Sequence, residues 1–500
     1  MRRLVATAAL LALAACSGGS EQPIELEEGD LWISGVTVVS MEREEPLRDA
    51  HVVVRGDRIV WVGAPPGSRA GIEPIDGTGR FLVPGLIDGH VHLGAPPPGM
   101  TAVDRARHRR LVSAYETQLP RSFLYFGFTT VVELGAKDRS ALARVRATEL
   151  APTVIDCGDP LVIANGYPMA MRRRVTARLA EFPNFLYDPS QAEAIPSSFS
   201  PSEHSPEAAV ARVRASGGRC VKAFYEPGNP ADPFPLPTEA MMRAVRSAAE
   251  ENALPLLMHA NSLDAHRFAA AAAPHAVAHG LWSWPGLMSA DVASGPFPAS
   301  LIAQVHAVLD AERSANVAYM PTLRVIDGLV DLDGPEFLER PQLARVLPRA
   351  LVDWYGSLAG QATAHEDNPG GPVSQILRSA SRLGVLSLAY TESKGSRILF
   401  GSDTPSGGGY GNPPGFNGFL EMRAMEAAGF RPARVLAAAT IENAKFFGID
   451  QDVGTIAVGR VADLLLLDRD PLASTEAFDS IRLVILKGRV VPRDSLAVRP

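Results

Sequence analysis

The chain has 500 residues, of which 46% are hydrophobic and 7% aromatic, enough to bury a large core. Its 48 Lys and Arg residues against 55 Asp and Glu give a formal net charge of -7, with no basic block that would follow a phosphate backbone. Extensive disorder and a nucleic-acid partner are therefore not expected. We expect one large domain with a smaller companion domain.

Residues 1–15 have the layout of a secretory signal: two arginines precede an apolar segment that is too short to cross a bilayer. The signal runs into Leu-Ala-Ala-Cys, which resembles the lipobox of bacterial lipoproteins. This resemblance implies cleavage before Cys16, a diacylglycerol group on its sulfur and, because Ser17 follows, sorting to the outer membrane. We expect a cell-envelope protein that faces the periplasm and touches the membrane only through this anchor, with residues 16–29 as a linker.

Cys157 and Cys220 are the other two cysteines. Two cysteines are too few for a disulfide scaffold, even in an oxidising compartment. We expect both to be buried thiols.

Both ends of the remaining chain are predicted to be β structure. Residues 30–83 contain LWISGVTVVS and HVVVRGDRIVWVG, which read as short strands separated by polar turns, one of them at Gly56 and Asp57. Strand character returns in VADLLLLD and IRLVILKGRVV, within residues 453–500. Because these two segments flank everything else, we predict that they pair into one small domain.

Residues 84–452 alternate apolar, strand-like runs with alanine-rich helical stretches. In PTEAMMRAVRSAAEENA, for example, Met242, Val245 and Ala249 fall on one helical face, and the strand-like LPLLMHA follows. This alternation predicts parallel βα units, arranged as a barrel or as a doubly wound sheet. The span between His279 and Asp403 is longer than one such unit and predicts a lid-like insertion.

Two histidines follow an apolar run in VPGLIDGHVHLG. Residues two apart in a strand share a face, so His90 and His92 would look into the same space, and neutral imidazole is the commonest metal ligand. Three more apolar runs end in candidate ligands: LPLLMHA in His259, HAVAHG in His279 and RILFGSD in Asp403. Alone, each could be a core histidine or a turn residue. Together they predict convergence at the carboxyl ends of parallel strands, where catalytic groups collect.

Lys222 lies within an apolar run in GGRCVKAFYE. A buried ammonium is costly, and desolvation lowers its pKa. A lysine at a strand end can extend to solvent instead. The functional alternative is that the neutral amine captures carbon dioxide as a carbamate, whose two oxygens can bridge two cations.

Taken in order along the chain, these segments resemble the amidohydrolase superfamily, and within it imidazolonepropionase and Xaa-Pro-type dipeptidases. The matching pieces are PGLIDGHVH, GFTTVVELG, the strand-end Lys222, His259, His279, GSDT, AATIENAKFFGI and VGTIAVGRVADLLLLD. The resemblance implies an α/β fold: a (β/α)8 TIM barrel over residues 84–452 carries the site, and a small β-sandwich is formed by residues 30–83 and 453–500.

The resemblance also implies a binuclear metal site. The ligands, carried over residue by residue, are His90, His92 and Asp403 for the first divalent ion, His259 and His279 for the second, and carboxylated Lys222 with a hydroxide as bridges. Zinc suits these ligands, and manganese, iron or cobalt could occupy the same set.

The implied reaction is hydrolysis of a C–N bond in a small amide, cyclic amide or dipeptide. Asp403 would be the catalytic acid/base: it would take the proton of the hydroxide as this attacks the carbonyl and pass it to the leaving nitrogen. Two positions depart from related patterns. Ser262 stands where nucleobase deaminases have a glutamate, which disfavours deamination. Imidazolonepropionase-like and Xaa-Pro-dipeptidase-like members often carry a His-x-Glu element after the Asp strand. Here Phe419 stands in place of its histidine and Glu421 in place of its glutamate, so the sequence does not say which residues make the substrate contacts of that element.

Other functions stay open at this point. The same site could hydrolyse lactones or esters, or the protein could bind a metal or ligand without turnover. Tyr225 is our candidate substrate contact, with ordinary loop packing as the alternative, and the arginine run at positions 172–174 could attract a carboxylate or be a solvated face. A homo-oligomer is compatible with the sequence.

Overall fold

The structure, a computed structural model, describes residues 24–67, 71–135, 138–171, 181–195, 198–229, 232–287, 295–406 and 409–499. The predicted signal peptide, Cys16 and the arginine run at positions 172–174 lie outside these ranges. Within them, no helix combines the length and the apolar character needed to cross a membrane.

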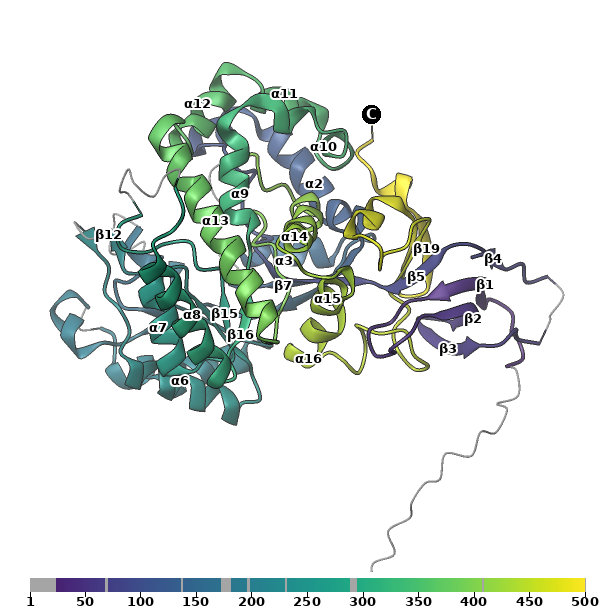
Figure 1. Cartoon of the computed structure of the whole chain (residues 1–500), viewed down its shortest axis with the longest axis horizontal. Coiled ribbons are helices and arrows are strands. Elements are labelled where there is room, and N and C mark those ends of the chain that lie inside the picture. The colour runs from purple at the N-terminus through teal and green to yellow at the C-terminus, as the bar shows by residue number, and fades with distance from the viewer. Residues whose placement is uncertain are drawn as a thin grey trace, which may run out of the picture.

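Strands from the two ends of the chain form one eight-stranded, largely antiparallel sheet, seen side by side in Figure 1. Its strands are β1 (Leu31–Val38), β2 (Leu47–Arg55), β3 (Arg58–Gly63), β4 (Ile75–Asp76), β5 (Phe81–Pro84), β17 (Leu464–Leu467), β18 (Ile481–Leu486) and β19 (Arg489–Pro492). The predicted turn at Gly56 and Asp57 joins β2 to β3, and Gly56 has a φ of 61°, which glycine adopts without strain. The predicted pairing of the two ends is therefore confirmed.

The run of four leucines in β17 explains how this sheet attaches to the rest. The strand pairs with β5, and all four side chains are buried. Leu464 and Leu466 pack in the hydrophobic cluster of this sheet, whereas Leu465 and Leu467 pack in the large cluster among the helices and parallel strands, called the main core below. Because side chains alternate along a strand, one uninterrupted apolar run serves both cores.

The central part of the chain contains two parallel sheets. They comprise β6 (Leu86–Val91), β7 (Phe128–Glu133) and β8 (Thr153–Asp156), and β11 (Val221–Phe224), β14 (Leu256–His259), β15 (Ala276–Ala278) and β16 (Ala318–Met320). Single parallel bridges extend the pairing, namely Leu161 with Ala223, Tyr319 with Ile398 and Val91 with Thr404. The fold is thus mixed α/β, with parallel strands as predicted.

Helices separate these strands in sequence. The larger ones are α2 (Arg109–Tyr125), α3 (Arg139–Arg146), α5 (Pro206–Ala215), α6 (Glu239–Glu251), α7 (Leu263–Ala272) and α8 (Ala299–Ser314). The predicted amphipathic helix is α6, which begins after the capping residue Thr238 and buries Met242, Val245 and Ala249. Its apolar face packs into the main core.

Between β16 and Asp403 the chain forms a group of helices, which extends from the top of the molecule in Figure 1 down through its centre. They are α9 (Arg324–Val330), α10 (Leu343–Val346), α11 (Arg349–Tyr355), α12 (Leu358–Asp367) and α13 (Gly371–Ser393). After Asp403 follow α14 (Phe416–Ala427), α15 (Pro432–Ala437) and α16 (Asn443–Phe446).

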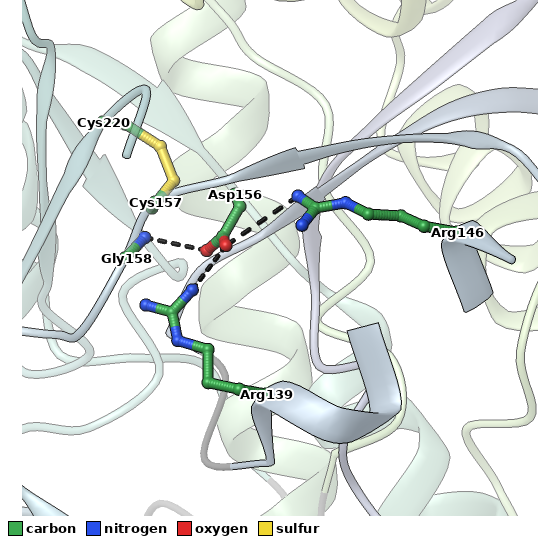
Figure 2. Close-up of a disulfide and its surroundings, with 6 residues drawn as sticks. All are labelled: Arg139, Arg146, Asp156, Cys157, Gly158 and Cys220. Carbon is green, nitrogen blue, oxygen red and sulfur yellow. Dashed lines mark hydrogen bonds and ion pairs between the residues drawn. A yellow bond between two sulfur atoms is a disulfide. The ribbon is translucent and has the colours of Figure 1, made fainter. Parts of the chain in front are cut away.

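The expectation of two separate thiols is wrong, because Cys157 and Cys220 form a disulfide (Figure 2). They are 63 residues apart in sequence, but β8 ends directly before Cys157 and β11 begins directly after Cys220. The Asp156 carbonyl accepts the Arg219 N–H at 2.8 Å, which holds the two strand ends together. Figure 2 also shows the Asp156 carboxylate held by Arg139 and by the Gly158 N–H. Strand adjacency, which the sequence does not state, thus brings the two sulfurs together.

Candidate metal-dependent active site

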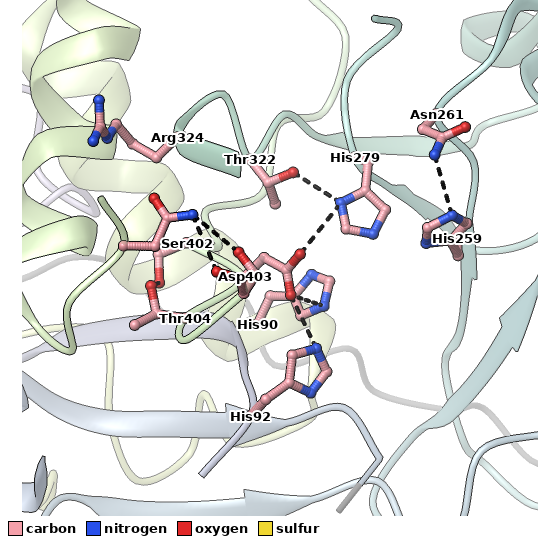
Figure 3. A network of polar contacts seen from close by, with 12 residues as sticks. His90, His92, His259, Asn261, His279, Thr322, Arg324, Ser402, Asp403 and Thr404 are labelled. Atoms are coloured by element: carbon pink, nitrogen blue, oxygen red, sulfur yellow. Dashed lines mark hydrogen bonds and ion pairs between the residues drawn. The ribbon is translucent and has the colours of Figure 1, made fainter. Parts of the chain in front are cut away.

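The two histidines of the His-x-His pair approach one carboxylate. His90 lies in β6 and His92 directly follows it, so their side chains point to the same side of the chain. Their Nε2 atoms lie 3.1 Å and 2.9 Å from Asp403 Oδ1 (Figure 3). On its other side, His92 Nδ1 is 3.5 Å from Glu133 Oε1, at the end of the neighbouring strand β7.

Asp403 follows the segment that bridges to β16, and hydrogen bonds hold the residues on both sides of it. The buried Asp88 carboxylate accepts the Ser402 N–H at 2.9 Å and the Ser402 hydroxyl at 2.5 Å. The Asn417 amide donates to the Ser402 carbonyl at 2.9 Å and to the Thr404 hydroxyl at 2.7 Å. These contacts come from β6 and α14, so two elements position one functional carboxylate.

Three residues at or next to this site have a strained backbone conformation. Asp403 has a φ of 52°, His279 of 91° and Thr322 of 44°, all in the left-handed region that non-glycine residues rarely adopt. Such residues cost about 1–3 kcal/mol each and gather at functional sites, where the surrounding structure holds them in place. The Thr322 hydroxyl oxygen also lies 3.0 Å from His279 Nδ1.

A second group of candidate ligands faces the first. His259 ends β14 and His279 follows β15, and their ring centroids are 4.5 Å apart. His279 Nδ1 is 3.9 Å from Asp403 Oδ2, and Figure 3 shows this imidazole between Asp403 and His259. His259 Nε2 is 3.3 Å from Glu226 Oε2, which also accepts the Asn261 amide at 2.8 Å.

Lys222, in β11, lies in the same cavity and is 2% exposed. Its Nζ has no hydrogen-bond partner and lies 5.6 Å from the centre of the Phe224 ring. Burial lowers its pKa to about 8, although the charge of Asp403 opposes that shift. The amine is therefore neutral in a larger fraction of molecules near neutral pH than an exposed lysine would be.

The histidines differ in protonation. Burial and the charge of Lys222 hold the pKa of His90 well below its usual value, and burial together with His259 does the same for His279. Burial also opposes the charged form of His92, but hydrogen bonds to Asp403 and Glu133 raise its pKa to about 9. Neutral imidazoles are the form that binds metal.

The donor set fits a divalent cation. Within the described part of the chain, His90, His279 and Asp403 each offer one ligand atom, all within 4.8 Å of one another. The unpartnered nitrogens of His90 (Nδ1) and Lys222 (Nζ) are buried in the same region. This three-residue group combines residues that the resemblance assigns to two different ions, because Asp403 lies between both groups of histidines.

These residues line a cavity of about 610 Å³. The predicted ligands His90, His92, Lys222, His259, His279 and Asp403 all border it. Its walls also contain residues that our sequence reasoning missed, chiefly Arg105, Glu133, Tyr167, Phe224 and Trp282. Glu133 ends a strand in GFTTVVELG and could have been found by the strand-end argument used for the histidines. Tyr167 and Trp282 lie in connecting segments without any such signal.

Tyr225 does not border this cavity. Its ring stacks on Phe268 of α7 with centroids 4.3 Å apart, and its N–H donates to the His259 carbonyl. This is the packing alternative named for it above. The strand geometry explains it, because Lys222 and Phe224 share one side of the chain and Tyr225 faces the other.

The two departures from related patterns, Ser262 and Phe419, have structural roles, and Phe419 stacks on Phe126 with ring centroids 5.4 Å apart. Ser262 caps α7 by accepting the Ala265 N–H at 3.1 Å. Glu421 is buried and accepts the N–H groups of Leu323 and Arg324 at 2.9 Å and 2.8 Å, where α9 begins. Ser262, Phe419 and Glu421 do not border the cavity.

Comparison with solved structures places the fold. The chain matches the crystal structure of an uncharacterized protein with a TM-score of 0.66 and 21% identity, over 93% of this chain and 100% of that one. It matches a Xaa-Pro dipeptidase with bound methionine at a TM-score of 0.63 and 18% identity, with the same coverage. At such identities the likeness concerns the fold alone.

Comparison with sequences is more local. Residues 373–491 match the Amidohydrolase family. An imidazolonepropionase of Aromatoleum aromaticum is 31% identical over 273 residues, which are 49% of this chain and 61% of the relative. The chain thus spans about three fifths of that curated relative.

Proposed function

We propose that this protein is a metal-dependent hydrolase that cleaves carbon–nitrogen bonds of small amides or peptides. The observation that carries the proposal is the convergence of four histidines, a buried lysine without a partner and one shared carboxylate in a single cavity. The Amidohydrolase family match and the likeness to an imidazolonepropionase and a Xaa-Pro dipeptidase agree with this reaction class.

The proposal includes a (β/α)8 barrel over residues 84–452. The two parallel sheets and three bridges run in the order that a closed barrel requires, with the segment before Asp403 as an eighth strand beside β6. The sheet from both chain ends would then be the β-sandwich formed by residues 30–83 and 453–500. Catalytic residues in such barrels sit at the carboxyl ends of strands, where His92, His259 and His279 lie.

We further propose two divalent ions, held as the resemblance implies by His90, His92 and Asp403 and by His259 and His279, with Lys222 as a carbamate between them. Zinc is our proposed metal because the ligands are imidazole and oxygen. Bound ions of this kind lower the pKa of water toward neutrality and polarise a carbonyl. Formation of the carbamate needs a neutral amine, and the lowered pKa of Lys222 increases the fraction of this form.

Asp403 is the proposed acid/base. Its carboxylate faces the cavity, where it would accept the proton of the attacking water and deliver it to the leaving nitrogen. Glu133 and Thr322 would orient His92 and His279, because each places an oxygen beside the Nδ1 atom of its histidine.

Arg105, from α1 (Ala102–Arg107), favours a peptide among the possible substrates. It borders the cavity, its guanidinium donates to the Met100 carbonyl, and no ion pair joins it to a described carboxylate. A guanidinium with free donors can bind a substrate carboxylate in a bidentate manner. Arg105 would thus attract the substrate carboxylate, a role that the sequence alone also allows for the arginine run at positions 172–174.

We also propose that the protein is exported and anchored in the outer membrane by a lipid on Cys16, with the protein facing the periplasm. The Cys157–Cys220 disulfide supports export, because disulfides persist in oxidising compartments.

Metal analysis of a form that begins at Ser17 tests the site. We expect about two metal equivalents in the wild type, falling to one or none in Lys222→Ala. Lys445→Ala, which removes an exposed lysine, is the matched control and should keep the wild-type content. Asp403→Asn should retain the folded structure by circular dichroism and lose hydrolysis of amides and dipeptides. Equal metal content in wild type and Lys222→Ala would contradict the bridged site, and no hydrolysis across amide and peptide panels would contradict the function.

A further inference from the structure

Aromatic rings flank the pair of histidines on both sides. The Tyr167 ring centroid lies 5.2 Å from that of His259, and the Trp282 centroid lies 5.3 Å from that of His279. All four residues border the cavity. Four rings therefore form a row in the order Tyr167, His259, His279 and Trp282, and the two in the middle are the proposed ligands of the second ion.

This row belongs to a larger aromatic wall. Phe224 lies 5.8 Å from Tyr167 and 5.6 Å from His259, measured between ring centroids, and Phe182 borders the cavity as well. These residues come from β11 and from connections far apart in sequence. The cavity thus has one aromatic wall, whereas its charged groups other than the ligands are Arg105 and Glu133.

The wall offers ring faces without burying charge. Burial raises the pKa of Tyr167 to about 12, with smaller contributions from Asp403 and Glu226, so its phenol stays neutral at physiological pH. Aromatic pairs in stacked or edge-to-face contact gain stability beyond what their buried area provides. An aliphatic group of the same size would gain only the stability that comes from its buried area.

The geometry points to a substrate that carries an aromatic ring next to the bond that is cleaved, selected by Tyr167 and Trp282. This inference rests on the proposed function, because a carbonyl held near Asp403 and the histidines brings its substituents against the wall. It narrows the substrate from small amides and peptides in general to those with an aromatic group beside the reacting carbon or nitrogen.

Paired dipeptides test the inference. Alanyl-phenylalanine and phenylalanyl-alanine are compared with the same dipeptides containing cyclohexylalanine, which has similar size and no aromatic face. We expect kcat/KM to be about fivefold higher for phenylalanine in at least one of the two orders. Tyr167→Leu and Trp282→Leu should each reduce this preference toward unity.

Tyr390→Leu is the matched control, because this tyrosine stacks on His306 outside the cavity, with ring centroids 3.7 Å apart. It should keep the wild-type preference. Metal content of the Tyr167 and Trp282 variants is measured in parallel. If these variants lost metal and kept the phenylalanine preference, the rings would serve only to pack the histidines, and the inference would be wrong.

Two outcomes separate this inference from the proposed function. Hydrolysis of all four dipeptides with equal kcat/KM would overturn the aromatic preference and leave the hydrolase standing. Hydrolysis of none would count against the function, and the preference would then be read from calorimetric binding of N-acetyl-phenylalaninamide and its cyclohexyl counterpart. Equal affinities in that measurement would overturn the inference as well.

Discussion

The disulfide gives a prediction whose size follows from the structure. Cys157 and Cys220 close a loop of 63 residues, and the loop-entropy relation assigns such a cross-link about 4 kcal/mol of unfolding free energy. A chain of this length has an unfolding entropy near 1 kcal/mol/K, so loss of the bond should lower the melting temperature by about 4 °C. The double variant Cys157→Ser/Cys220→Ser should show this shift by differential scanning fluorimetry.

The same experiment contains its control. Reduction with a thiol reagent should lower the melting temperature of the wild type by about 4 °C and leave that of the double variant unchanged. A form that begins at Ser17 has only these two cysteines, so it should show no free thiols when it is denatured without a reductant. Two free thiols, or a shift of less than about 1 °C, would refute the reasoning.

Two further predictions concern hydrogen bonds accepted by the partly buried His275 and the buried Glu421. His275 Nδ1 accepts the Leu256 N–H at 3.0 Å, and burial lowers the pKa of His275 to about 4, so only the unfolded chain takes up this proton between pH 6.5 and 4. The free energy of unfolding should therefore fall by about 1 kcal/mol, after allowance for solvent screening, as the pH drops through that window. Urea titrations should show a smaller fall in His275→Gln. An identical fall in both proteins would exclude this histidine as the cause. Glu421→Leu should lower the free energy of unfolding by about 2–4 kcal/mol, because it leaves the N–H groups of Leu323 and Arg324 without an acceptor. Glu421→Gln keeps one acceptor oxygen and should lower the free energy of unfolding less. Equal decreases in the two variants would contradict this account.

Local pattern was sufficient for the strands, the turn and one helix face. The hairpin turn at Gly56 and Asp57 and the buried face of α6 depend on residues that are neighbours in sequence, where strand and helix periods decide which side chains are buried. Strand periodicity likewise predicted His90, His259 and Asp403 as site residues, and the structure places them around one cavity.

What the sequence could not decide depends on which strands lie side by side. The disulfide needs the end of β8 close to the start of β11, and the sequence carries no measure of that distance. Tyr225 is close to Lys222 in sequence, yet the pleat turns it toward Phe268. Tyr167 reaches the cavity from a connection more than fifty residues earlier. The sequence by itself thus determined the elements and the chemical types at their ends, because these follow from local periodicity. The tertiary structure decided the disulfide, the aromatic wall and the positions of Arg105 and Glu133, because these depend on the distances between segments remote in sequence.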